Sequence, residues 1–322
     1  MALDRSLSGL PGRADVWTEG STARAVLVDG QRLAVVALKY SAEQSSYQRL
    51  GQPVQFQVSD PQADGVIETA TIARDGHNRW WIAYPWQRRM WVRSSLDADG
   101  VEWTEPIAVS REVNADDLCA IVSLPGGVGV IWSDQGSDAL YFCWHKDGSN
   151  PKTWEPIEEI DRGDLTADDH IHAAVSSDGA LFLATKNSVD RVDHPQLVLR
   201  VRHPDGRWEN LPYARRTADE EPSRPIVLVG GDPARLLLLH TLYGRGNVKP
   251  QVNRIVWQSA PIRNLTGAIL DTTSQSLIGP IEGINNVTGS KASLPKGKPW
   301  IVLASDAAGR VYEGCIEPGE SQ

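Results

Sequence analysis

The stretch HAAVSSDGALFLATKNS, residues 172–188, contains the pattern that decides the fold. A short alternating segment runs into an Asp-Gly turn and then into a run of apolar residues. Asp-Gly supplies the positive φ that tight hairpin turns require. The stretch therefore predicts two antiparallel strands joined by a short turn.

The same pattern recurs along the chain. The apolar runs are LAVVALKY (33–40), WWIAYPW (80–86), VGVIWSDQ (128–135), LFLATKNS (181–188), LLLLHTLY (236–243) and WIVLASD (300–306). A tryptophan motif keeps the same interval, because Trp103, Trp154, Trp208 and Trp257 are 51, 54 and 49 residues apart. No segment has the apolar period of an amphipathic helix. Six units of about fifty residues, each with roughly four short antiparallel strands, predict an all-β, six-bladed β-propeller.

The units cover roughly residues 23–60, 66–109, 115–160, 167–213, 220–262 and 284–317 of a single domain that spans 1–322. The last unit lacks a terminal tryptophan strand. The segment ADVWTEG around Trp17 resembles such a strand, and no unit precedes it. We therefore expect residues 13–19 to complete the last blade and to close the ring, which would remove its free edges.

Three predicted hairpins share a turn motif: SSLDADGVEW (94–103), HKDGSNPKTW (145–154) and RHPDGRW (202–208). They resemble degenerate Asp-boxes, the S-x-D-x-G-x-x-W turns of the sialidase and BNR-repeat superfamily. Residues 115–317 are also similar to a group of bacterial sialidase-like propellers without an assigned activity. The resemblance implies the propeller fold. Sialidase catalysis is not carried over. Only two arginines, Arg24 and Arg224, have positions that suit the sialidase arginine triad, and the catalytic tyrosine has no counterpart.

Composition excludes several function classes. A net charge of −9 over 322 residues disfavours general binding to nucleic acid or anionic membranes. Three cysteines, Cys119, Cys143 and Cys315, form neither a disulfide framework nor a zinc motif. The motifs of nucleotide, hydride and acyl chemistry are absent, and we expect no cofactor. With no export signal and no membrane-spanning run, we expect a soluble protein, secreted or periplasmic if a leader was removed and otherwise cytoplasmic.

In a propeller the first strand of each blade runs along the central channel, so the starts of these strands gather at one mouth of it. Polar groups that converge in a concavity are the default location of a ligand site. Alignment of the six units brings the following residues together: Arg24, Glu68, Asp116, Asp117, Asp168, Asp169, His170, Arg224, Asn285 and Asn286.

The segment DDHIH, residues 168–172, is the densest of these groups. His170 and His172 are two residues apart and would share one face of a strand. One of them could act as a general base, since an imidazole titrates near neutral pH. Asp168 or Asp169 could join them around a metal, but such sites usually need three or four ligands, and we do not expect one. Alternatively, the carboxylates only form an Asx-type turn where a strand begins.

Cations and aromatic rings extend this candidate site. Lys186, Arg224 and Lys291 are the cations that the alignment brings there, and the arginine fork suits the carboxylate of a uronate or sialic acid. Arg224 could instead pair with an acidic residue of TADEEPSRP (217–225). Tyr84 and Trp86 fall where a second strand ends, so they are candidates for stacking on a sugar ring, although packing between blades would also explain them.

Three functions follow as hypotheses. The first is a propeller that binds a carbohydrate at the channel mouth without necessarily cleaving it, with Arg24, Tyr84, Trp86, Asp117, Asn285, Asn286 and Lys291 as ligand-binding residues. The second is a polysaccharide lyase or glycoside hydrolase of uronate-containing glycans, with His170, His172, Asp169, Arg224 and Lys186 as catalytic residues. In it a histidine moves a proton while the cations neutralise the uronate. The third is a protein-interaction scaffold.

Overall fold

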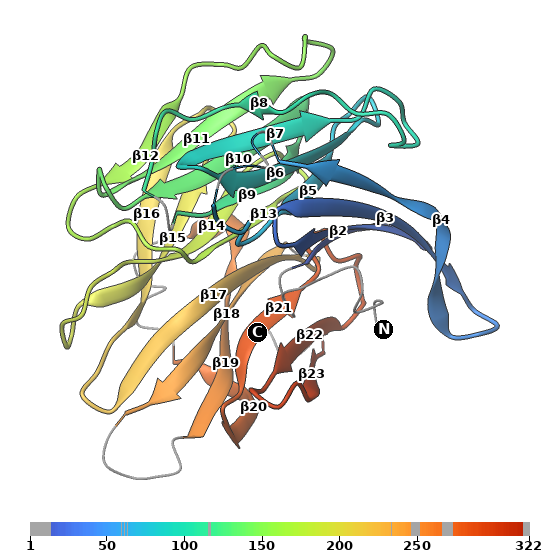
Figure 1. Cartoon of the computed structure of the whole chain (residues 1–322). Helices are drawn as coiled ribbons and strands as arrows, with labels where there is room; N and C mark the ends of the chain where they lie inside the picture. The colour runs from blue at the N-terminus through green and yellow to red at the C-terminus, as the bar shows by residue number, and fades with distance from the viewer. Residues whose placement is uncertain are drawn as a thin grey trace. The chain divides into compact units, whose positions relative to one another are not determined.

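The computed structural model describes residues 14–58, 60, 62, 64–114, 117–232, 234–245, 252–265 and 273–317. Regular structure in these residues is almost entirely β-strand, apart from a short 3₁₀ helix, η2 (Ile262–Asn264) (Figure 1). The chain divides into two compact units, Met1–Ile160 and Asp161–Gln322, called unit 1 and unit 2 below. Helical structure within the described ranges is far too short to span a bilayer.

Unit 1 is built from three antiparallel sheets, each of four strands. The first sheet contains β1 (Asp15–Glu19), β2 (Thr22–Asp29), β3 (Arg32–Ser41) and β4 (Ser46–Gln57). The second contains β5 (Thr71–Arg74), β6 (Trp80–Trp86), β7 (Arg89–Ser94) and β8 (Ile107–Ala108). The third contains β9 (Cys119–Leu124), β10 (Gly127–Asp134), β11 (Ala139–Lys146) and β12 (Glu158–Arg162), the last of which reaches the boundary with unit 2.

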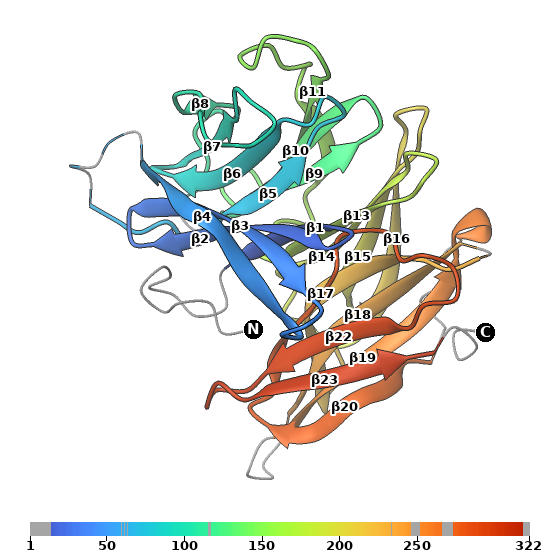
Figure 2. The same ribbon diagram turned by 90° about the vertical axis from the view of Figure 1, so that its right-hand side faces the viewer.

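Unit 2 repeats this arrangement (Figure 2). Its first sheet contains β13 (Ile171–Val175), β14 (Leu181–Lys186), β15 (Pro195–Arg202) and β16 (Trp208–Arg215). The next contains β17 (Glu220–Gly230), β18 (Arg235–Gly244), β19 (Val252–Pro261) and β20 (Gln275–Glu282). The last contains β21 (Asn285–Gly289), β22 (Trp300–Ser305) and β23 (Val311–Ile316), so it has three strands in the described part of the chain.

Each sheet is a meander, in which strands that follow one another in the chain are hydrogen-bonded neighbours. Tight turns make this possible: Gly30 joins β2 to β3 with a φ of 60°, and Gly179 lies between β13 and β14 with a φ of 90°. Glycine adopts these left-handed angles without steric cost. Six consecutive antiparallel meanders are the blades of a six-bladed β-propeller, which confirms the fold class predicted from the repeats.

The N-terminal strand corrects one expectation. Strand β1 pairs with β2, with Trp17 opposite Arg24, so it is the first strand of the first sheet and not the closing strand of the last. A two-residue turn at Gly20 and Ser21 joins the two strands, and such a short loop costs little entropy to close. Each strand of this sheet therefore stands one place later than predicted, and Arg24 lies on the second strand instead of the first.

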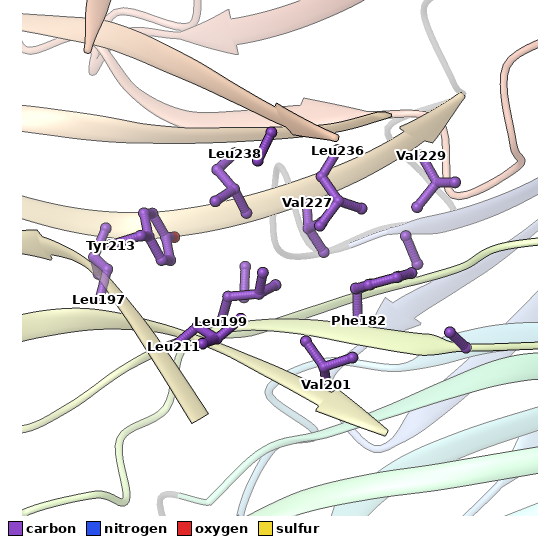
Figure 3. Packing of buried hydrophobic residues seen from close by; sticks show 14 residues of the cluster. Phe182, Leu197, Leu199, Val201, Leu211, Tyr213, Val227, Val229, Leu236 and Leu238 are labelled. Carbon is purple, nitrogen blue, oxygen red and sulfur yellow. The ribbon is translucent and has the colours of Figure 1, made fainter. Parts of the chain in front are cut away.

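Buried aliphatic side chains hold adjacent sheets face to face. Figure 3 shows Leu199 and Val201 of β15 opposite Val227 of β17 and Leu236 of β18, and each of these side chains is at most 1% exposed. Full burial of one such side chain stabilises the fold by about 1.5–3 kcal/mol. The sheet of β13–β16 and the sheet of β17–β20 are thus fixed against each other, which gives rigid support to side chains at the ends of their strands.

Candidate functional site

The first strands of consecutive sheets run parallel to one another. In unit 1 the Asp15 carboxylate on β1 accepts the N–H of Ile72 on β5, and Glu19 further along β1 pairs with Arg74 further along β5. Because the second contact lies further along both strands than the first, β1 and β5 run in the same direction. The starts of neighbouring first strands therefore lie at the same end of a unit.

Unit 2 has the same arrangement in β13, β17 and β21. The N–H of Val227 on β17 donates to Nδ1 of His172 on β13 at 3.3 Å. The next residue of β17, Leu228, lies against Gly289 of β21. Arg224, three residues before Val227, is connected through the Tyr243 hydroxyl to Asn285, the first residue of β21. The start of β13, the Arg224 part of β17 and the start of β21 therefore lie along one end, and we call this region the strand-start end of unit 2. It carries Asp168, Asp169, His170, Arg224, Asn285 and Asn286.

Asp168 is the centre of the polar cluster before β13. Its Oδ1 lies 2.6 Å from Nδ1 of His170, and its Oδ2 accepts hydrogen bonds from Lys186 Nζ at 3.0 Å and Ser188 Oγ at 3.1 Å. The carboxylate of Asp169 also lies 2.6 Å from His170 Nδ1. The side chains of His170 and Lys186 are each 17% exposed and that of Asp168 is 8% exposed. The structure thus joins four predicted site residues in a largely buried ion-pair network.

The network sets the charge of both central groups. Burial acts to raise the pKa of Asp168, but the hydrogen bond from His170 and the charge of Lys186 hold that pKa below its usual 3.8. Burial acts to lower the pKa of His170, but hydrogen bonds to Asp168 and Asp169 raise it above its usual 6.5. His170 therefore keeps its proton to higher pH than an ordinary histidine, and its Nδ1 is already engaged by the two carboxylates.

His172 has the opposite electrostatic character. Burial lowers its pKa to about 3, and the nearby charge of Lys291 adds to this effect. Its Nδ1 already accepts the Val227 N–H. His172 is therefore neutral at physiological pH and has little tendency to take up a proton. His172 therefore lacks the near-neutral pKa that general base catalysis favours.

Arg224 is the central cation on β17. Its Nε donates to the hydroxyl of Tyr243 at 3.2 Å, and this hydroxyl donates to Oδ1 of Asn285 on β21 at 2.7 Å. Within the described residues no ion pair involves Arg224. Two of the three acidic neighbours that the sequence offered as partners are used elsewhere, because Glu220 pairs with Arg254 and Glu221 with Arg245.

Backbone strain marks the same place. Arg224 and Asn286 have φ angles of 51° and 53°, and each lies inside a strand at a break in register, between Ser223 and Ile226 or between Asn285 and Thr288. The other described non-glycine residues with positive φ lie in turns or loops. Such backbone costs about 1–3 kcal/mol per residue and gathers at functional sites. Bulges of this kind re-aim side chains.

One group at this end has metal-ligand chemistry. The ligand atoms of Asp168, Asp169 and His170 lie within 4.8 Å of one another. His170 Nδ1 is already engaged by the two carboxylates, and Lys186 provides a positive charge 3.0 Å from Asp168. A cation would have to displace both contacts. The cluster is therefore a charge-compensated network, and we derive no metal chemistry from it.

Two candidates in unit 1 have structural partners. Nη1 of Arg24 donates to the carbonyl of Asp99 at 2.7 Å, and its guanidinium stacks over Trp80 at 4.4 Å. Asp117 is 1% exposed and accepts hydrogen bonds from Ser133 Oγ and from the backbone N–H of Asn114 and Gln135. These contacts hold loops in place, so we do not retain either residue as a ligand contact. Asp116 lies outside the described residues, and Glu68 is half-buried.

The two aromatic candidates, Tyr84 and Trp86, are core residues and not ligand contacts. Tyr84 is fully buried and Trp86 is 4% exposed, and both belong to the core between the first and second sheets of unit 1. Neither offers a ring face to a sugar. The expectation of stacking on Tyr84 and Trp86 is therefore corrected, because β6 is buried on both of its faces.

Three residues at or next to the candidate site were not predicted from the sequence. Ser188 hydrogen-bonds to Asp168 and Tyr243 to Arg224, and Arg200 hydrogen-bonds to Thr166, two residues before Asp168. Tyr243 could have been found, because it is the residue before last of the second strand of its sheet, and Lys186 is the last residue of the second strand of the preceding sheet. Ser188 and Arg200 carry no comparable signal. Of the remaining predicted residues, Asn286 is exposed and Lys291 follows β21.

Comparison with known proteins identifies the fold. No protein-family model matches this chain, and no curated protein sequence matches it. Among solved structures, a Dyadobacter fermentans protein of unknown function aligns with 94% of this chain and 93% of its own, at 11% identity and a TM-score of 0.56. The Hadza microbial sialidase Hz136 aligns with 97% of this chain and 66% of its own, at 13% identity and a TM-score of 0.55.

A further solved structure is the Penicillium chrysogenum α-L-arabinanase complexed with arabinobiose. It aligns with 78% of this chain and 81% of its own, at 11% identity and a TM-score of 0.50. Identities this low establish a common fold and no common chemistry. The function of this chain therefore has to be argued from its own side chains.

Proposed function

We propose that this propeller binds a carbohydrate bearing an acidic group at the strand-start end of unit 2, with Arg224 as the main contact. The observation that carries the proposal is the unpaired charge of Arg224 within the described residues, next to two polar partners, Tyr243 and Asn285. A guanidinium without a carboxylate partner is suited to bind one from a ligand, through two parallel hydrogen bonds.

Several features support a sugar as the rest of the ligand. Hydroxyl and amide groups from Tyr243, Asn285 and Asn286 offer both donors and acceptors, as sugar hydroxyls require. Solved propellers with the same fold include a sialidase and an arabinanase complexed with arabinobiose. Acidic and basic residues are nearly equal in number from Asp161 onward, so most of the net charge of −9 belongs to unit 1, and unit 2 itself has almost no net charge that would repel an acidic ligand.

Binding is favoured over lyase chemistry. A lyase needs a base beside the sugar and a free cation on its carboxylate. Nδ1 of His170 is engaged by two carboxylates, His172 has a pKa of about 3, and Lys186 is paired with Asp168. Of the catalytic residues that the lyase hypothesis named, Arg224 is the cation without an ion-pair partner among the described residues. No described contact favours a role as a protein-interaction scaffold.

A glycan array with acidic and neutral oligosaccharides tests the proposal. We expect the wild-type protein to retain acidic glycans, and Arg224→Gln to lose at least about tenfold in affinity, which corresponds to about 1.4 kcal/mol. Arg207→Gln is the matched control, since it removes an equal charge from an exposed turn. Equal binding by Arg224→Gln and the wild type, or retention of neutral glycans only, would refute the proposal. Ultraviolet-absorbing unsaturated products would favour the lyase.

A further inference from the structure

Arg200 on β15 has a fully buried guanidinium that hydrogen-bonds to residues next to the Asp168 cluster in the chain. Its side chain is 0% exposed. Nε and Nη2 donate to Oδ2 of Asp161 at 3.1 and 2.8 Å, and Nη2 also donates to Thr166 Oγ1 at 3.1 Å and Asn187 Oδ1 at 3.0 Å. Nη1 donates to the hydroxyl of Thr185. One side chain thus connects two segments that are distant in sequence.

Those two segments carry the polar cluster. Thr166 is two residues before Asp168, and Thr185 and Asn187 flank Lys186. Ser188 adds contacts at the same junction, because its Oγ lies 2.8 Å from the carbonyl oxygen of Ala167 and 3.1 Å from Asp168 Oδ2 and shares its one proton between them. The backbone before β13 and the end of β14 are therefore tied together at several points.

We infer that Arg200 is a positioning residue, whose guanidinium fixes the Asp161–Asp168 segment against the end of β14 and so holds Asp168 between His170 and Lys186. Its relevance to ligand binding rests on the function proposed above. The geometric part stands on the hydrogen bonds of Arg200 alone.

The choice of arginine supports a positioning role. A buried charge is expensive to desolvate, and apolar side chains of similar volume often stabilise a protein core better than a buried ion pair does. Arginine is the one side chain with a planar fork of five N–H donors, which can bind several acceptors in fixed directions. Four different residues accept from this fork, and three of them lie within two positions of Asp168 or Lys186.

The test is an NMR pH titration of the His170 imidazole in the wild type, in Arg200→Met and in Arg200→Lys. We expect a lower His170 pKa in Arg200→Met and a smaller decrease in Arg200→Lys, because Asp168 is released from its position beside the ring. Gln258→Met is the control, since it removes another buried polar side chain in unit 2 and should leave the His170 titration unchanged. Should Arg200→Met fail to fold, Thr166→Val and Asn187→Ala remove single partners of the guanidinium.

The outcome separates this inference from the proposed function. An unchanged His170 titration in folded Arg200 variants would refute the positioning role whether or not any glycan binds. A lowered His170 pKa, together with several-fold weaker binding of an acidic glycan, supports both proposals. If the His170 pKa is lowered in the Arg200 variants but the wild-type protein itself binds no acidic glycan, the result supports the positioning role and refutes the proposed function.

Discussion

Nδ1 of His170 lies 2.6 Å from Oδ1 of Asp168, a carboxylate that is almost entirely shielded from solvent. The contact between them lowers the pKa of Asp168 and raises that of His170, so removal of the Asp168 carboxylate should change the pKa of His170. We expect Asp168→Asn to lower the His170 pKa and to reduce the free energy of unfolding by about 3 kcal/mol, since it leaves two cations without their buried partner. NMR titration and urea unfolding measure the two effects. Asp193→Asn, the same change at an exposed position, should do neither.

The same pair predicts how stability depends on pH. The pKa of Asp168 is depressed in the folded state, so its contribution is present above the unfolded value of 3.8 and is lost as pH falls. The pKa of His170 is raised, so its contribution is complete below 6.5 and is lost as pH rises through the folded value. Wild-type stability minus that of Asp168→Asn should therefore be largest between these values. A difference independent of pH would contradict the network.

Tyr243 links the guanidinium of Arg224 to the amide of Asn285 through its hydroxyl. Tyr243→Phe removes both hydrogen bonds and keeps the ring. We expect a roughly tenfold loss of affinity for an acidic glycan and a decrease of about 1 kcal/mol in unfolding free energy. Isothermal titration calorimetry and urea unfolding measure these effects. Tyr141→Phe, which removes a hydroxyl bonded to Ser137 in unit 1, should match the stability change without the binding change.

The repeat was sufficient to predict the blades because it reports local structure. Alternating residues, a turn with glycine and a second apolar run specify a hairpin wherever they occur, as at Gly30 and Gly179. The partner of the N-terminal strand was not predictable in this way. The segment around Trp17 fits the edge of the last sheet as well as that of the first, and proximity to β2 decided between them.

The candidate site was predictable only where the repeat fixed the position of a strand start. Asp168, His170 and Lys186 come together because their positions within the unit define them, and Arg224 comes near Asn285 for the same reason. What these side chains contact depends on tertiary geometry. The sequence could not predict that Lys186 would pair with Asp168, while Arg224 has no ion-pair partner in the part of the chain that the structure describes.

Burial on both faces explains the failed aromatic candidates. Alternation along a strand separates two faces, but a blade inside a propeller packs on both of them. Trp81 and Tyr84 point to opposite sides of β6, and both are fully buried. Tyr84 and Trp86 therefore belong to the core, although Trp86 is the last residue of β6.

Asp97 organises the hairpin after β7. Its two carboxylate oxygens accept the backbone N–H groups of Val101 at 3.1 Å and Glu102 at 2.9 Å. These hydrogen bonds lower the pKa of Asp97, so its contribution to stability is present above the unfolded value of 3.8 and is lost in acid. We expect Asp97→Ala to reduce the free energy of unfolding by about 1 kcal/mol at neutral pH and by less in acid, measured by urea unfolding. Asp99→Ala in the same turn is the control, and an equal loss there would contradict the role of Asp97.

The three cysteines should differ sharply in reactivity. Cys119 and Cys143 are 4% and 1% exposed, and burial raises the pKa of each thiol to about 12, whereas Cys315 is exposed. Because the thiolate is the reactive form, we expect a disulfide reagent such as DTNB, used at about pH 8, to modify one thiol rapidly in the native protein and all three after denaturation. Cys315→Ser should abolish the rapid phase. Rapid modification of a second thiol in the native protein would mean that the cores around Cys119 and Cys143 open readily, contrary to the packing described above.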